Sequence, residues 1–248
     1  MRKNHLPRGL AALLETAILF LPAIPADLWL WPNVSGVWQE AAQSLVYLYV
    51  LAGSLFIGLR RWNIGELGFN RQGIGLSLAC GALLIAGRTL VILAVDWHAD
   101  PSQPGIGRLL WELLFYFGLV ALSEELLFRG LIYRAFDDWI GVKWAVWGSS
   151  LAFMLWHIFG QGPLVGLAML FYGLVFALMR LRAGGIVGLI LVHGLIDLSA
   201  ARLMPDVDVL SLGRPDVPRP LWLILGLGLI LAVPILLWKG FPRSNQPS

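Results

Sequence analysis

Three ionisable residues lie close together in a stretch of sequence that is otherwise apolar. Glu124, Glu125 and Arg129 all fall within residues 122–129. A charged group at the centre of a bilayer costs roughly 2.5–3.5 kcal/mol on insertion scales, so three such groups require a compensating role. Residues one helical turn apart share a face, so Glu125 and Arg129 are predicted to form an internal ion pair. Glu124 then points roughly 100° away and is predicted to face a cavity.

Two histidines and an aspartate lie at a similar depth in later apolar segments. His157 follows Phe153 by one helical turn, and Asp197 follows His193 by the same interval. At about 1.5 Å per residue, Glu124 and His157 are each roughly 21–22 Å from the turn that joins their helices. His193 and Asp197 lie roughly 14 and 20 Å in from the same side. The four side chains are therefore predicted to share one layer of the membrane, and the directions in which they face are left open.

The composition places this layer in a lipid bilayer. Of 248 residues, 58% are hydrophobic and 13% are charged, whereas a soluble domain carries roughly 25% charged residues. Eight apolar segments are each about long enough to cross a hydrocarbon core of ~30 Å. They are predicted at residues 9–26, 38–59, 74–95, 108–130, 143–160, 163–180, 184–201 and 220–238. We therefore predict an all-α fold, a polytopic membrane helical bundle of about eight transmembrane helices, as a single integral-membrane domain over residues 1–248.

The distribution of basic residues predicts the orientation of this bundle. Lys and Arg concentrate in alternate connections, as at Arg60–Arg61 and Arg180–Arg182, and are sparse in the others. Because short basic connections stay in the cytoplasm, both termini are predicted to be cytoplasmic. An even number of spans gives the same result. The net charge of +3 is no sign of nucleic-acid binding, and the single cysteine excludes an intramolecular disulfide.

Further polar residues in the apolar segments have weaker interpretations. Arg108 and Glu112 are one helical turn apart and are predicted to form an interfacial pair. Glu15 and Arg88 have no partner nearby in the sequence. Each could line a cavity or extend to the interface, and a Glu15–Arg88 pair is one possibility.

The order of the polar motifs resembles a family of membrane endopeptidases, the CPBP superfamily of CAAX proteases and bacteriocin-processing enzymes. Three motifs on successive apolar helices carry the resemblance: Glu124-Glu125-x-x-x-Arg129, Phe153-x-x-x-His157 and His193-x-x-x-Asp197. They define a predicted CPBP-like catalytic core at residues 108–201. The chain departs from the eukaryotic prenyl-protease pattern at Asp197, where those enzymes carry Asn. An aspartate donates no hydrogen bond unless it is protonated, so a simple oxyanion-stabilising role is in doubt.

The resemblance implies an intramembrane endopeptidase of a bacterial cytoplasmic membrane. Its partners would be the lipid bilayer and peptide or protein substrates at the membrane, of the prenylated or leader type. Glu124 would act as the general base, and His157 would help it to hold the attacking water. His193, with Asp197, would stabilise the oxyanion or orient its donors. The resemblance also gives Glu125 and Arg129 a structural role, which is to orient the site.

The cofactor is either none or zinc. Glu124, His157, His193 and Asp197 are an acceptable zinc-ligand set with water at the open position. The helical His-Glu-x-x-His signature of many zinc proteases is absent from the sequence. A metal-free mechanism is preferred, because Glu124 and Glu125 together can supply the base and the electrostatics without an ion.

A non-catalytic membrane protein is the alternative. A proton-coupled transporter or a scaffold could use the same buried polar layer, since proton relays also employ Glu, His and Asp at membrane depth. No internal repeat pairs the two halves of the sequence, and the polar groups crowd into residues 112–197. These two features favour the enzyme. No nucleotide-binding or nucleic-acid-binding motif is present.

Overall fold

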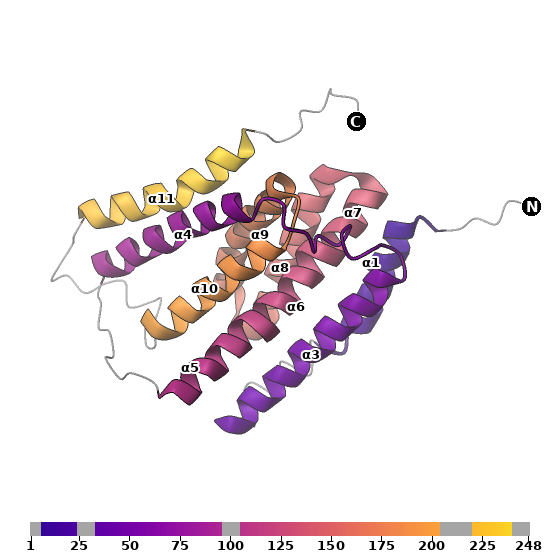
Figure 1. Ribbon diagram of the computed structural model, residues 1–248, viewed down its shortest axis with the longest axis horizontal. Helices are drawn as coiled ribbons and strands as arrows, with labels where there is room; N and C mark the ends of the chain where they lie inside the picture. The colour runs from indigo at the N-terminus through magenta and orange to yellow at the C-terminus, as the bar shows by residue number, and fades with distance from the viewer. Residues whose placement is uncertain (1–5, 24–32, 96–104, 204–219, 240–248) are drawn as a thin grey trace, which may run out of the picture.

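The computed structural model describes residues 6–23, 33–95, 105–203 and 220–239. Within these ranges the chain is helical, with turns and short connections and no strand, so the predicted all-α bundle is confirmed (Figure 1). Eight continuous helices are described: α1 (Arg8–Phe20), α3 (Val37–Leu59), α4 (Ile74–Val95), a long helix at Ile106–Ile140, α8 (Val142–Gln161), α9 (Pro163–Ala183), α10 (Val187–Leu203) and α11 (Pro220–Trp238).

The long helix, Ile106–Ile140, carries the paired glutamates and is called the site helix below. It is not a uniform α-helix. It consists of five successive parts: α5 (Ile106–Leu113), η1 (Leu114–Ala121), α6 (Leu122–Glu124), η2 (Glu125–Ile132) and α7 (Tyr133–Ile140). Both η segments are π-helical. π-Helical turns are rare and are frequently found at functional sites. Nothing in the sequence signalled them.

Five helices of the described chain are long and apolar enough to cross a membrane. They are Val37–Leu59, Ile74–Ile92, Ile106–Ile140, Pro163–Ala183 and Pro220–Trp238, and α10 contains a shorter apolar stretch. Large apolar side chains such as Leu221, Ile224 and Ile235 of α11 are exposed on the outside, as expected for a surface that faces lipid. The chain is therefore an integral membrane protein. α1 has 13 residues and covers only about 20 Å, which is less than a full span.

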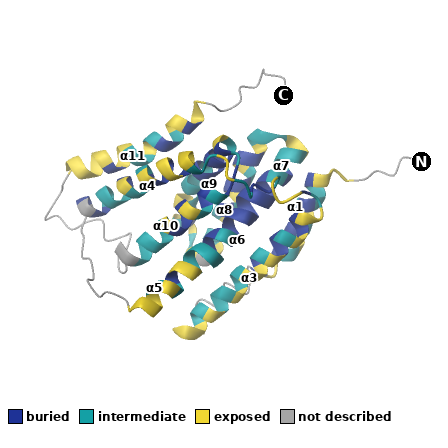
Figure 2. Ribbon diagram, viewed as in Figure 1, coloured by how far each residue is buried: buried dark blue, intermediate teal, exposed yellow. Residues whose placement is uncertain are grey.

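The site helix lies at the centre of the bundle. It packs against α3, α8 and α10. Farther out, α4 packs against both α10 and α11, and α9 packs against α8. Every residue of η2, Glu125–Ile132, is buried. Figure 2 shows the buried residues gathered around this helix and α8, with exposed residues on the outer helices. The core is thus built around the segment that contains the charged residues.

The start of α1 and the end of α11 lie at the same end of the bundle, together with the turns that join α7 to α8 and α9 to α10 (Figure 1). An even number of spans requires this arrangement. The assignment of this end to the cytoplasm stays a prediction.

The connection between α3 and α4 holds this end of the bundle together. Its Gly68 carbonyl accepts a hydrogen bond of 2.8 Å from the backbone of Ile186, and Asn70 Nδ2 donates one of 3.1 Å to the Gly184 carbonyl. Gly68 has φ +96°, and a side chain there would press against Arg180 and Ile186. Glycine is therefore required where the connection passes the α9–α10 turn.

The suggested Glu15–Arg88 pair is wrong. Glu15 Oε1 lies 2.5 Å from Arg61 Nη2, because α1 packs beside the end of α3. Arg88 Nη1 donates instead to the Ile196 carbonyl at 3.0 Å and to Ser199 Oγ at 3.3 Å on α10. The partners were set by helix packing, which two isolated charges in a sequence do not reveal.

Candidate active site

The predicted Glu125–Arg129 pair is present at the centre of the site. Arg129 Nη1 donates to Glu125 Oε1 at 3.0 Å, and both side chains are fully buried. The guanidinium lies against aromatic faces, with Cζ 4.3 Å from the Phe153 ring centroid and 5.3 Å from that of Phe176. Cation–π contacts of this kind are stronger when they are shielded from water. The pair is therefore compensated by its partner and by the rings around it.

Helix α9 also holds Arg129, through its side chain and through its backbone carbonyl. Its Nη2 donates to the Gly173 carbonyl of α9 at 3.4 Å, and its own carbonyl accepts a bond of 3.2 Å from Arg180 Nε. Arg180 thus satisfies a carbonyl within η2, where the helical geometry departs from the α form. Arg180 lies on the same helix as Gly173, so α9 holds Arg129 at two points.

His193 joins the separate carboxylates into one cluster. Its Nδ1 is 2.7 Å from Glu125 Oε1, which also accepts from Arg129. Its Nε2 is 3.4 Å from Asp197 Oδ2 and 3.7 Å from Glu124 Oε2. Both ring nitrogens therefore face acceptors. The helix that carries His193 and Asp197 and the site helix meet at this imidazole.

Glu124 has an unengaged oxygen beside this imidazole. Its Oε2 is buried and has no hydrogen-bond partner among the described residues. Glu125 Oε1 is committed to both Arg129 and His193, and its Oε2, like that of Glu124, is buried without a hydrogen-bond partner among the described residues. Both carboxylates therefore keep one unbonded oxygen, and they differ in that Glu125 is fixed by Arg129 and His193, whereas the free oxygen of Glu124 faces His193 Nε2.

His157 joins the cluster through an aromatic ring rather than by direct contact. Its Nδ1 lies 2.9 Å from the Phe153 carbonyl, one turn earlier in α8. A carbonyl can only accept, so Nδ1 is the donor and Nε2 of the neutral ring is left as an acceptor. The Phe153 ring centroid is 4.4 Å from His157 and 6.3 Å from His193. No hydrogen bond or ion pair joins His157 to Glu124 in the described part of the chain.

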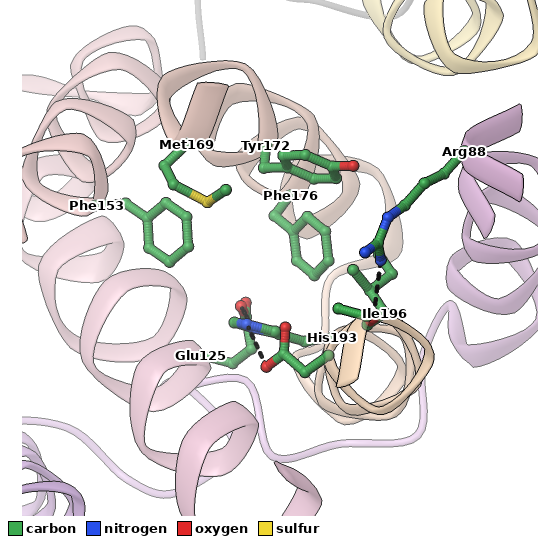
Figure 3. Close-up of a pocket in the computed structure, with 10 residues that line it drawn as sticks. Arg88, Glu125, Phe153, Met169, Tyr172, Phe176, His193 and Ile196 are labelled. Atoms are coloured by element: carbon green, nitrogen blue, oxygen red, sulfur yellow. Dashed lines mark hydrogen bonds and ion pairs between the residues drawn. The ribbon is translucent and has the colours of Figure 1, made fainter. Parts of the chain in front are cut away.

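A cavity of about 210 Å³ opens beside the cluster (Figure 3). Met169, Tyr172 and Phe176 of α9 lie on one side of it, across from Glu125 and His193. The full lining is Arg88, Glu125, Phe153, Met169, Tyr172, Phe176, His193, Ile196, Asp197 and Ala200. One water occupies about 30 Å³ of liquid volume, so the cavity is large enough for several waters or part of a peptide.

The lining of this cavity includes a glutamate that was predicted to be structural, and one of its walls was not predicted. Glu125, rather than Glu124, is among its lining residues. The α9 wall was missed because Met169, Tyr172 and Phe176 look like ordinary lipid-facing residues in an apolar segment. Arg88 lines the cavity, which is one of the two positions that the sequence left open for it.

The proposed zinc ligands do not surround a common point. Among the described residues, no three His, Cys, Asp or Glu side chains are arranged to hold a metal ion. The preference for a metal-free mechanism stays a prediction.

Comparison with known proteins supports the resemblance that the motifs carry. Residues 106–199 match the model of a family described as type II CAAX prenyl endopeptidase Rce1-like. The match is consistent with the CPBP family and with a protease, and the matched segment nearly coincides with the core predicted at residues 108–201. The matched segment contains all six of the charged and imidazole residues described above, from Glu124 to Asp197.

Similarity to a named protein is more distant. The chain is 28% identical to an uncharacterized 24.3 kDa protein of Escherichia coli over 168 residues. The aligned region covers 60% of this chain and 72% of that protein. No solved structure matches the chain.

Proposed function

We propose that this protein is an intramembrane endopeptidase that hydrolyses peptide bonds of membrane-associated substrates. One observation carries the proposal: within the segment that matches the Rce1-like model, a buried carboxylate oxygen of Glu124 that has no hydrogen-bond partner among the described residues lies 3.7 Å from Nε2 of His193. A general base needs an acceptor that is not already engaged and a neighbouring group that can respond to charge. Prenylated or leader-type peptides in a bacterial cytoplasmic membrane are the proposed substrates.

In the proposed reaction, Glu124 removes a proton from a water molecule. The remaining hydroxide attacks the carbonyl carbon of the scissile peptide bond, and Glu124 then delivers the proton to the leaving amine. His157 is suited to help hold the water, because its Nε2 is the acceptor nitrogen when Nδ1 donates to Phe153. General acid–base catalysis of this kind contributes typically about 10²–10⁴-fold.

The negative charge that develops on the substrate oxygen requires a donor. His193 is the proposed source, since Nδ1 is held by Glu125 and a proton on Nε2 would point to the side of the cluster occupied by Glu124 and Asp197. Asp197 aligns this ring as an acceptor, which removes the need for it to act as a donor itself. Preorganised donors aimed at developing charge are usually the largest contribution to catalysis. Glu125 and Arg129 keep the imidazole in place.

The test compares cleavage by wild type with that by Glu124→Ala. Membranes that contain each form are compared by quantitative proteomics, and a peptide released only by wild type is then assayed with the purified proteins. Glu124→Ala is expected to abolish cleavage without changing the thermal unfolding midpoint. Glu15→Ala is the matched control, because Glu15 pairs with Arg61 away from the cluster, and it should cleave at the wild-type rate.

Two results would contradict the proposal. Near-normal cleavage of a verified substrate by Glu124→Ala would remove the assigned base. Loss of activity with a chelator, restored by zinc, would replace the metal-free mechanism with a metal-dependent one. The transporter or scaffold alternative predicts no difference in released peptides between wild type and Glu124→Ala, and the family match does not favour it.

A further inference from the structure

A tyrosine from outside the Rce1-like segment reaches the paired glutamates. Tyr47 lies on α3, whereas the family match begins at residue 106. Its hydroxyl is directed to the Glu124 carboxylate as a side-chain hydrogen-bond donor. α3 packs directly against both α6, which ends at Glu124, and η2, which begins at Glu125. A helix outside the segment that matches the family model therefore contacts the proposed base.

The sequence of α3 places Tyr47 on the face that meets the site helix. Glu40, Tyr47 and Ser54 follow one another at intervals of seven residues. Residues seven apart on an α-helix lie on almost the same face, with a drift of about 20°. Ser54 is fully buried, and Glu40 contacts the site helix directly. Polar residues at this spacing in an apolar span are thus turned to the protein rather than to lipid.

Contacts on either side of Tyr47 fix its position. Toward one end of α3, Glu40 Oε1 lies 2.7 Å from Arg108 Nη1, and its Oε2 accepts a bond of 3.1 Å from Trp111 Nε1. The Tyr47 ring packs edge-on against Phe115, with the centroids 6.0 Å apart. Phe115 also packs against Trp111 at 5.9 Å. Tyr47 is therefore anchored by its ring, and its hydroxyl is presented to Glu124.

We propose that Tyr47 is a positioning residue that holds the Glu124 carboxylate so that the unpartnered oxygen faces His193. The inference rests on the proposed function. A buried carboxylate that is bonded at one oxygen cannot rotate away from its water, and the ordering is supplied by the protein before substrate binds. A hydrogen bond to a charged group contributes enough that its loss corresponds to roughly a tenfold or larger change.

The experiment compares two tyrosines of the same helix. Tyr47→Phe removes the hydroxyl that faces Glu124 and keeps the ring that packs on Phe115. Tyr49→Phe is the matched control: the Tyr49 hydroxyl donates to the Leu19 carbonyl of α1, and its ring packs on Phe20 away from the cluster. kcat and KM are measured for both variants with the same peptide substrate, beside wild type and Glu124→Ala, and the thermal unfolding midpoint of each is recorded.

Tyr47→Phe is expected to lower kcat about tenfold or more with KM within about twofold, whereas Tyr49→Phe changes neither by more than about twofold. An unchanged kcat for Tyr47→Phe beside an inactive Glu124→Ala would overturn the positioning role and leave the proposed function intact. A rise in KM alone would also overturn it, because that would indicate a substrate contact. If both tyrosine variants lost the same activity and the same unfolding midpoint, the role of Tyr47 would be packing alone and the positioning role would be overturned. Cleavage by Glu124→Ala would instead contradict the proposed function itself.

Discussion

A cavity and a groove lie along the site helix, and the side chains that line them differ in polarity. The cavity of about 210 Å³ contains Glu125, His193, Asp197 and Arg88, whereas a groove of about 500 Å³ between α1, α8 and the site helix is almost wholly apolar. The groove is lined by Leu13, Thr16, Ala17, Phe20, Leu21, Leu127, Phe128, Ile132, Phe136, Gly148, Leu151, Ala152, Leu155, Trp156 and Phe159. The wall between them is formed by Phe128 and Phe153, whose rings pack edge to face at 5.1 Å.

The comparison shows how a membrane protein confines charge. The one hydroxyl of the groove, that of Thr16, is bonded within its own helix to the Ala12 carbonyl at 2.7 Å. The charged groups of the cavity instead compensate one another across three helices. An unpaired buried charge is expensive, so charges are retained only where partners converge. Chemistry is therefore expected on the cavity side of the aromatic wall and not in the groove, although the groove is larger.

The largest expected effect comes from breaking the central pair. Arg129→Met leaves Glu125 buried without its guanidinium partner, which typically costs about 3–5 kcal/mol of folding free energy. We expect a large drop in the free energy of unfolding, measured by chemical denaturation in detergent, together with loss of cleavage.

A double variant separates charge from packing in this prediction. Glu125→Leu combined with Arg129→Met removes both charges, and replacing a buried pair by apolar side chains is often neutral for stability. The double variant should therefore regain much of the lost stability while remaining inactive, because His193 has lost its acceptor at Nδ1. A double variant as unstable as Arg129→Met would show that packing, rather than charge, caused the loss.

The next prediction compares two neighbouring residues of α8, one packed beside the cavity and one in the lining of the groove. His157 contacts the cavity residue Phe153, whereas Trp156 lines the groove. His157→Gln is expected to lower kcat by about 10²–10⁴-fold, the usual range for a lost acid–base partner. Its stability should change little, since the one hydrogen bond it loses lies within its own helix.

Trp156→Phe is the control for this pair, and it should retain cleavage within a few-fold of wild type. Rates for both variants are measured with one substrate and at equal protein concentration. If Trp156→Phe reduced kcat as strongly as His157→Gln, the inference that the cavity is reactive and the groove is not would be contradicted.

The smallest effect is expected from filling the groove. Ala17→Leu adds apolar volume at an exposed position of α1, and surface substitutions of this kind usually change stability by no more than about 0.5 kcal/mol. Cleavage should stay within about twofold of wild type. Ala200→Leu adds the same volume to the lining of the cavity and should inhibit cleavage. Equal inhibition by both would place the groove on the path of the substrate.

Local spacing accounts for the contacts that could be predicted. The pairs Glu125–Arg129 at 3.0 Å and Arg108–Glu112 at 2.8 Å were both predicted, because residues one helical turn apart meet whatever the helix packs against. His193 and Asp197, predicted to share a face, approach to 3.4 Å for the same reason. The π-helical turn that begins at Glu125 and the Arg61 partner of Glu15 were not predictable in this way.

The sequence by itself determined that this is a helical membrane protein with a buried polar layer, since apolar length and the cost of charge in lipid are properties of the chain. Only the tertiary structure decided which groups meet. It placed His193 between Glu124 and Glu125, brought Tyr47 to Glu124, and made α9 a wall of the cavity. The physical reason is that helix periodicity fixes neighbours within one helix, whereas contacts between helices depend on how each helix is rotated and packed.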